Sequence, residues 1–255
     1  MLKFDLISVP VFNKNVWDFC NSKRYFLSII ILSHQKPEHL DNSLWSILNQ
    51  KISCGYEIIV VDDGSNNGIE EVILKYGSLF QEKKLKYIKI CTRLGYYKPL
   101  LVGGAAADGE VLYIHHDDVI FDTDKYIETL MQNLDAETIA VFPKGFRYVS
   151  TKFSDFGFDW KKEPEKIKSL ESHFYQDCPW FISGCIRRED LRKYTLNNCP
   201  YPEGSGEGFL ENTLRKTGKK FKFIEDLIAY HVKHEVAFFG EGVPYYWWGN
   251  VKEPA

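Results

Sequence analysis

Apolar runs and amphipathic segments alternate along the first half of the chain, and this alternation limits the possible fold more than any other feature. Each apolar run is short, rich in β-branched residues and continuous rather than alternating, as expected of strands buried on both faces of a parallel sheet. The predicted strands cover residues 26–32, 57–61, 85–91 and 110–115. The segments between them, residues 37–48, 69–76 and 100–105, have apolar residues at helical spacing. Strands that alternate with helices predict an α/β fold with a mainly parallel sheet.

The second half of the chain is less regular. The pattern predicts one more helix at residues 126–134 and one more strand at 139–142, and periodicity is then lost from 143 to 178. We interpret residues 143–178 as a variable loop region. Further elements are predicted at the positions that follow: a returning strand at 180–186, a helix from 209 closed by Gly218, and two short strands at 221–224 and 227–230.

Composition excludes several classes of protein. The net charge of -3 gives no general case for binding nucleic acid. The six cysteines include no C-x-x-C pair, so neither a zinc knuckle nor a redox motif is predicted. The longest apolar stretch is too short to span a bilayer and residues 1–25 do not resemble a signal peptide, so we expect a cytoplasmic protein or one peripheral to the inner face of the membrane.

Two acidic pairs follow directly after predicted strands. Asp62-Asp63 follows the second strand and Asp117-Asp118 follows the fourth, which places both at the carboxyl edge of the sheet, where open α/β folds bind ligands. Asp62-Asp63-Gly64-Ser65 is equally good chemistry for a capped turn. The Asp117-Asp118 pair indicates a bound cation more strongly, because adjacent carboxylates repel each other unless a cation intervenes. A hard divalent ion would bridge them to phosphate oxygens.

Four blocks of residues, in this order and spacing, resemble the nucleotide-binding half of the family-2 glycosyltransferases, which have the GT-A fold. They are Ser28-Ile29-Ile30-Ile31, the helix end Ile47-Leu48-Asn49-Gln50, the run from Glu57 to Ser65, and Ala107-x-Gly109-Glu110 leading into Asp117-Asp118. The resemblance covers somewhat over a third of the chain. It implies an N-terminal extension at residues 1–25, a nucleotide-sugar-binding half at 26–142 and an acceptor-binding half of the same domain at 143–255.

The resemblance also implies roles for particular residues. Asp63, beside Asp62, would contact the nucleobase, and Ser33 and His34 would contact the nucleoside. Asp117 would lie near the ribose or the sugar, and Asp118 would bind Mn2+ or Mg2+.

The chain departs from the family at two places. His34-Gln35 stands where Tyr-Asn is usual, and Leu100 and Leu101 stand where an Arg-Asn pair is usual. Lys98 or Arg93 is expected to supply the missing positive charge.

The second half offers a base and a further metal ligand. Counted back from Gly218, Glu207 falls on the position of the family's catalytic carboxylate, with Glu203 and Glu211 as competitors. The alternative is that Glu207 only complements the helix dipole. Some GT-A enzymes use a late histidine as a metal ligand, which makes His231 a candidate, although a lone histidine is more often structural.

The expected activity is therefore transfer of a sugar, with inversion, from a UDP- or dTDP-sugar to a hydroxyl of a glycan or lipid-linked acceptor, in the synthesis of surface polysaccharide or lipo-oligosaccharide. Peripheral contact with a membrane would accompany a lipid-linked acceptor, and the sequence predicts no particular oligomer. One alternative is a degenerate GT-A domain that acts as a binding or scaffold module. A sugar-nucleotide nucleotidyltransferase is less favoured because residues 33–37 lack the glycine-rich loop that such an enzyme needs.

Overall fold

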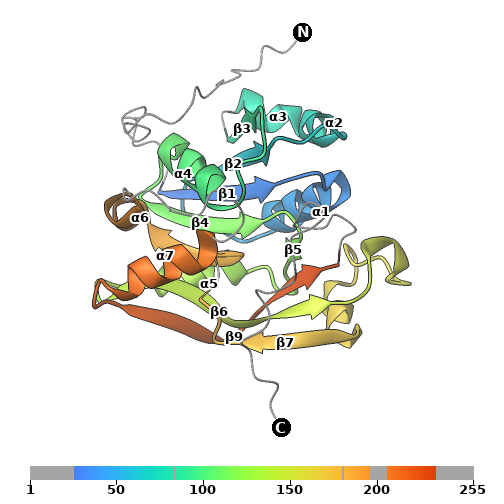
Figure 1. The fold of residues 1–255 in the computed structure, drawn as a ribbon. Coiled ribbons are helices and arrows are strands. Elements are labelled where there is room, and N and C mark those ends of the chain that lie inside the picture. The colour runs from blue at the N-terminus through green and yellow to red at the C-terminus, as the bar shows by residue number, and fades with distance from the viewer. Residues whose placement is uncertain (1–25, 83, 180, 196–205, 234–255) are drawn as a thin grey trace, which may run out of the picture.

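The computed structural model describes residues 26–82, 84–179, 181–195 and 206–233. The expected extension at residues 1–25 and the candidate base Glu203 lie outside the described residues. Within the described part, the strands join in one sheet flanked by helices (Figure 1), which confirms the predicted α/β fold.

The first half of the chain builds a parallel sheet in the order β3-β2-β1-β4. Its strands are β1 (Leu27–Ser33), β2 (Tyr56–Asp63), β3 (Leu85–Ile90) and β4 (Val111–His116), followed by the short β5 (Val119–Ile120). The helices between and after them are α1 (Pro37–Leu48), α2 (Ile69–Lys75), α3 (Gly77–Gln81), α4 (Tyr97–Ala106) and α5 (Tyr126–Gln132).

The strands β1, β2 and β4 of this parallel sheet are buried on both faces, which explains why they are mostly apolar. Along β1, Ile29 and Ile31 pack into one core cluster together with residues of α1, α2 and α5. Ile30 and Leu32 point the other way, into a second cluster with α4 and the later helices. Successive side chains of a strand point to opposite faces, so a strand with helices on both sides has no position left for a polar face.

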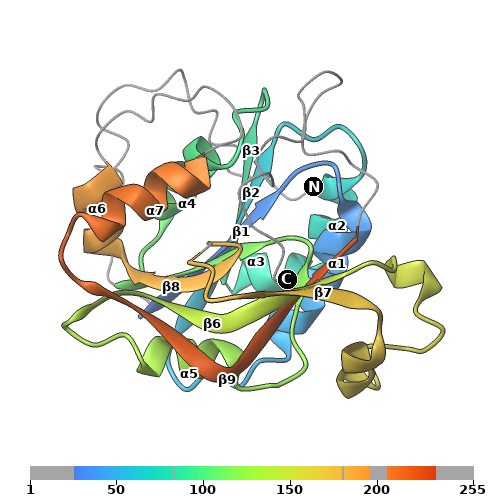
Figure 2. The same ribbon diagram turned by 60° about the horizontal axis from the view of Figure 1, so that its bottom comes forward.

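The second half of the chain extends the sheet through β8, β6 and β9 to β5, with β7 on β6. The later elements are β6 (Thr138–Val149), β7 (Ser172–Gln176), β8 (Ser183–Arg187), α6 (Arg188–Thr195), α7 (Gly206–Arg215) and β9 (Lys220–Val232). Figure 2 shows β6 and β9 side by side as long, curved strands, and β9 runs parallel to β6 over its whole length.

Residues 143–178 correct the prediction of a loop region. β6 continues to Val149, and after two 3-10 helical turns, η2 (Phe153–Asp155) and η3 (Pro164–Ser169), the chain returns as β7. The excursion between β6 and β7 is packed rather than loose, since Phe153 and Trp160 are buried and Trp160 meets Trp45 of α1 edge to face. The two short strands predicted at 221–224 and 227–230 are likewise one strand, β9, whose pairing with β6 is irregular between Pro143 and Gly145.

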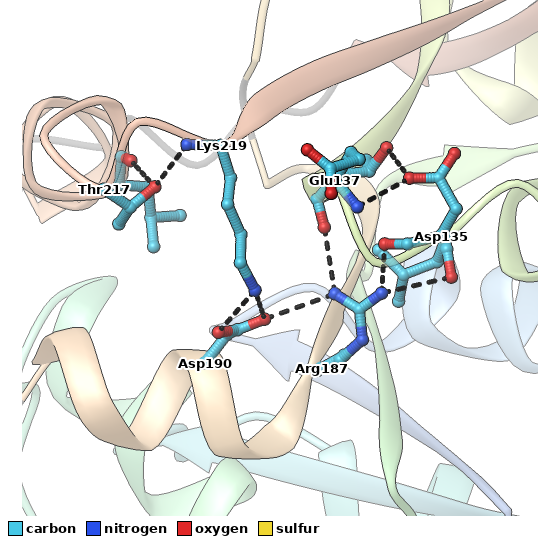
Figure 3. A network of polar contacts seen from close by, with 9 residues as sticks. Asp135, Glu137, Arg187, Asp190, Thr217 and Lys219 are labelled. Atoms are coloured by element: carbon cyan, nitrogen blue, oxygen red, sulfur yellow. Dashed lines mark hydrogen bonds and ion pairs between the residues drawn. The ribbon is translucent and has the colours of Figure 1, made fainter.

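A polar clasp joins α6 to the ends of β6 and β9 (Figure 3). Asp190 is 5% exposed and accepts from Arg187 Nη1 at 3.3 Å and from Lys219 Nζ at 3.3 Å. The Arg187 guanidinium also donates to the main-chain carbonyl groups of Leu134, Asp135 and Thr138. The clasp therefore fixes the start of β9 relative to the turn that precedes β6.

A second polar network ties β1 and β2 together at the amino ends of the parallel strands. Glu57 is fully buried, and its Oε1 accepts from Ser28 Oγ at 2.7 Å and from the Asp108 main-chain N–H at 2.6 Å. Ser28 Oγ in turn accepts from the Gly109 N–H at 2.8 Å. Lys86 Nζ closes the network, 2.8 Å from Glu57 Oε2 and 3.0 Å from Asp108 Oδ2.

Over the residues that the structure describes, none of the helices has both the length and the apolar character needed to cross a bilayer.

Candidate donor site at the sheet edge

The carboxyl ends of β1 and β4 bring together residues that are more than 80 positions apart. Ser33 Oγ donates to Asp117 Oδ2 at 2.7 Å, and the main-chain N–H of His34 reaches the same oxygen at 3.3 Å. The parallel register of β1 and β4 explains this contact. It pairs Leu32 with His116, the residues directly before Ser33 and Asp117. Ser33, His34 and Asp117, all predicted as donor-binding residues, therefore lie at one point of the sheet edge.

Lys36 binds both members of the acidic pair, which the sequence did not predict. Its Nζ lies 2.7 Å from Asp117 Oδ1 and also contacts Asp118 Oδ2. Burial lowers the pKa of Lys36, but the attraction of the two carboxylates outweighs burial and leaves the pKa raised. Lys36 is thus a charged ammonium, 7% exposed, inside the candidate site.

His231 reaches the same site from β9, the last strand that the structure describes. Its Nε2 lies 3.0 Å from Asp118 Oδ1. Pairing of Val119 with His231 across β5 and β9, and a hydrogen bond of 2.8 Å from the Val232 N–H to the Asp118 carbonyl, hold the imidazole there. The structure thus joins Asp118 and His231, the two residues predicted as metal ligands.

The two carboxyl groups of the acidic pair differ in their electrostatic surroundings. Burial raises the pKa of Asp118, but attraction to His231 and Lys36 outweighs it and holds that pKa well below the usual range. For Asp117, burial dominates and the pKa is raised, with Lys36 opposing the shift. Asp118 is therefore the more firmly ionised carboxylate and the better anchor for a cation.

Asp62 and Asp63, the last two residues of β2, have different hydrogen-bond partners. The Asp63 carboxylate accepts the main-chain N–H groups of Leu94 at 2.7 Å and Gly95 at 2.9 Å, and its carbonyl accepts from His34 Nδ1 at 2.7 Å. Burial raises the pKa of Asp63, and the two N–H donors oppose it. Because each carboxylate oxygen has two acceptor positions, Asp63 keeps capacity for a ligand while it orders the 92–95 segment beside it.

The carboxylate of Asp62 is hydrogen-bonded to other groups of the fold. Its Oδ1 accepts the Ser65 N–H at 2.9 Å and its Oδ2 accepts the Tyr87 hydroxyl at 2.7 Å, and the side chain is fully buried. This is the capped turn that the sequence offered as the alternative. Contact of Asp62 with a nucleotide stays a prediction.

The two histidines before the acidic pair are held neutral by burial. The ring of His115 shares hydrogen bonds with the Tyr113 hydroxyl at 3.0 Å and Ser43 Oγ at 2.8 Å. Burial lowers the pKa of both His115 and His116 to about 3. His115 is thus part of the packed core beneath the site.

The remaining predicted site residues lie on helices around this edge. Lys98 is half-buried in the first turn of α4, and Leu100 is fully buried in the core, so the usual family position at Leu100 supplies no polar group here. Glu207 is the second residue of α7. Its competitor Glu211 forms an ion pair of 2.7 Å with Arg215. The roles of Lys98 and Glu207 stay predictions.

The donor atoms at Asp118 fit a divalent ion with open positions. A carboxylate oxygen and an imidazole nitrogen 3.0 Å apart can both lie within about 2.1 Å of one ion. Over the described residues, no group of three or more His, Cys, Asp or Glu side chains forms a closed metal cage. An ion held by Asp118 and His231 would have open positions for phosphate and water, as is usual for ions that bind nucleotides.

The fold, with acidic residues meeting at the carboxyl edge of its parallel strands, is that of a GT-A glycosyltransferase. A solved mannosyltransferase from Pyrobaculum calidifontis, in complex with GDP-Man and Mn2+, has this architecture, with a TM-score of 0.57 and 15% identity over 84% of this chain and 59% of that one. Residues 28–194, about two thirds of the chain, match Glycosyl transferase family 2, and the chain belongs to that family.

Curated relatives match over a shorter stretch. A chondroitin synthase of Escherichia coli is 38% identical over 63 residues, which are 25% of this chain and 9% of the relative. A chondroitin synthase of Pasteurella multocida is 34% identical over 68 residues, 27% of this chain and 7% of the relative. The chain thus matches less than a tenth of the length of these relatives.

Proposed function

We propose that this glycosyltransferase moves a sugar from a UDP- or dTDP-sugar to a hydroxyl of a glycan or lipid-linked acceptor, with inversion at the anomeric carbon and with Mn2+ or Mg2+. The single observation that carries the proposal is the convergence of Ser33, Asp117, Asp118 and His231 on one point at the sheet edge, with Asp63 on the neighbouring strand β2. The match to chondroitin synthases supports a setting in polysaccharide synthesis.

Each residue then has a defined task. Asp63 accepts an N–H of the nucleobase, His34 and Ser33 line the nucleoside, and Asp117 lies by the ribose or sugar. Asp118 and His231 would hold the ion, which would supply positive charge beside the departing diphosphate. Lys98 adds positive charge on the phosphate side.

Inversion needs a base on the face opposite the leaving group. We assign this task to Glu207, which takes the proton of the acceptor hydroxyl as its oxygen attacks the anomeric carbon. The bond to the nucleoside diphosphate breaks as the new glycosidic bond forms, so no covalent intermediate with the protein is needed. The position of Glu207 in the first turn of α7 supports the assignment, because a helix N-terminus stabilises an ionised carboxylate.

The test is a panel of nucleotide sugars with Mn2+, assayed for transfer and for slow donor hydrolysis. Asp118→Asn is expected to lower turnover at least about 100-fold, since a metal ion contributes several kcal/mol to the transition state. Asp41→Asn is the matched control, because Asp41 is a surface carboxylate on α1 paired with Lys75. The proposal fails if the wild-type protein binds and hydrolyses no donor and Asp118→Asn is indistinguishable from it.

Calorimetry distinguishes the scaffold alternative. A catalytic donor site binds UDP more tightly when Mn2+ is present, because the ion bridges protein and diphosphate. A degenerate binding module would bind UDP weakly and to the same extent with and without the metal.

A further inference from the structure

We propose that Lys36 is a built-in counter-ion of the acidic pair, which a divalent cation must displace, and that Lys36 therefore sets the metal affinity of the site. This inference rests on the proposed metal-dependent function. Its basis is the position of Lys36 Nζ, in contact with both Asp117 and Asp118 and almost completely buried.

Two buried carboxylates need positive charge nearby whether or not a metal is bound. Asp117 and Asp118 are 1% and 0% exposed, so water does little to screen their repulsion. The Lys36 ammonium supplies one positive charge, since its Nζ lies 2.7 Å from Asp117 Oδ1 and contacts Asp118 Oδ2. The acidic pair thus has a counter-ion that belongs to the chain itself.

The ammonium and a divalent ion would share the Asp118 carboxylate, each at a different oxygen atom. Lys36 Nζ contacts Asp118 Oδ2, while Asp118 Oδ1 faces His231. An ion bound by Asp118 and His231 would lie close to Nζ, and two positive charges a few ångströms apart repel strongly in a buried site. The divalent ion consequently binds fully only after Nζ has moved.

The place of Lys36 in the chain allows that movement. It is the residue before α1, in the turn after β1, and its charge sits on a flexible four-carbon stem. The predicted nucleoside contacts are close to it in the chain, since Ser33 ends β1 and His34 lies in the same turn as Lys36. A diphosphate arriving with the ion would give the displaced ammonium a new anionic partner, so metal and nucleotide should bind cooperatively through Lys36.

The chain contains a matched control for this arrangement. Lys86 also places one ammonium between two carboxylates, those of Glu57 and Asp108, but at the amino ends of the strands, away from the site. Loss of Lys86 removes the same kind of ion pair without touching the acidic pair.

The experiment measures Mn2+ binding by electron paramagnetic resonance, without nucleotide and with UDP, for wild type, Lys36→Met, Lys36→Gln and Lys86→Met. Without nucleotide, we expect both Lys36 variants to bind Mn2+ at least about tenfold more tightly than wild type, since a buried competing charge is gone. Lys86→Met should bind as wild type does. UDP should improve Mn2+ affinity much more in wild type than in the Lys36 variants.

Thermal unfolding gives a second readout. Both lysine losses should lower the melting temperature, but Mn2+ should raise it more in the Lys36 variants than in Lys86→Met, because tighter binding to the native state stabilises it more. The inference is overturned if the Lys36 variants bind Mn2+ no more tightly than wild type, or if Mn2+ rescues Lys86→Met equally well.

The two proposals fail in different ways. If wild type transfers sugar but neither it nor the Lys36 variants bind Mn2+, the Lys36 inference is wrong and the transferase stands. If the Lys36 variants gain Mn2+ affinity but no donor is bound or turned over, the proposed function is wrong and the counter-ion role of Lys36 stands.

Discussion

Replacing Gly109 by alanine is expected to lower the free energy of unfolding by about 3 kcal/mol. A Cβ at this position would lie 2.6 Å from the main-chain nitrogen of Ser28 and 2.7 Å from both the carbonyl carbon of Leu27 and the hydroxyl of Ser28. Overpacking costs about 1–3 kcal/mol, and the upper end applies here because two of the three atoms belong to the backbone of β1.

The substitution should also weaken the hydrogen bonds next to the steric clash. The Gly109 N–H donates to Ser28 Oγ, which donates to the buried Glu57. Pushing β1 away from Gly109 would lengthen these bonds and weaken the network at the amino ends of the strands. At about 2–4 °C per kcal/mol for a chain of this size, the melting temperature should fall by about 6–12 °C.

The site itself should survive this change. Asp117 lies at the other end of β4, eight residues further on, which is roughly 25 Å of extended chain. Donor affinity of the folded Gly109→Ala protein should therefore match that of wild type. Urea unfolding followed by tryptophan fluorescence measures the stability, and calorimetry at low temperature measures the affinity.

Gly157→Ala is the matched control. Nothing lies within 4 Å of a Cβ added at Gly157, but its φ of +70° is a left-handed conformation, so alanine should cost only about 1 kcal/mol. The packing argument is refuted if Gly109→Ala costs no more than Gly157→Ala.

Three further predictions concern the folded protein away from the acidic pair. Tyr87→Phe should lower the free energy of unfolding by about 1–2 kcal/mol, because Asp62 Oδ2 loses its hydroxyl donor; an unchanged urea midpoint would contradict this. Asp190→Asn should lower the free energy of unfolding by about 1–2 kcal/mol in the same assay. This is less than the loss of a fully buried ion pair costs, because Arg187 and Lys219 keep water or carbonyl acceptors. A loss above about 4 kcal/mol would contradict this reasoning. Iodoacetamide should label Cys91, which is exposed, and not Cys185, whose thiol pKa is raised by complete burial; peptide mapping that finds native Cys185 labelled would be inconsistent with its burial.

The parallel half of the fold could be predicted because its strands are buried on both faces. Such strands bury apolar side chains on both faces, and this leaves a direct record in residues 29–32 and 58–61. The position of the two acidic pairs could be predicted from the same strands, because the carboxyl ends of parallel strands lie at one edge of the sheet. The match to Glycosyl transferase family 2 and the GT-A architecture confirm the family and fold expected from these blocks.

The later strands were harder because their exposure varies along their length. In β6, Phe146 and Val149 are buried whereas Arg147 and Tyr148 are partly exposed, so no single period continues after residue 142. β7 is mostly exposed and leaves almost no apolar signal. The end of β6 and all of β7 are defined by hydrogen bonds between strands rather than by buried side chains. The pattern of apolar residues in the sequence does not indicate such pairing.

Lys36 was missed for a different reason. A lysine before a proline at the start of a helix is typical of a solvated surface, and its partners lie 81 and 82 residues further along the chain. Lys98 and Arg93 were considered instead because they lie closer to the departures at Leu100 and Leu101. Only the meeting of β1 and β4 in three dimensions reveals which lysine neutralises the acidic pair.

The contribution of β9 has a consequence for biosynthesis. His231 and the main chain at Val232 reach Asp118 only once the last described strand has left the ribosome, more than 110 residues after Asp118 itself. A nascent chain that has folded only its first half presents the carboxylates without the imidazole. Premature termination before residue 220 should therefore yield fragments that have the parallel strands but lack one ligand of the proposed metal site.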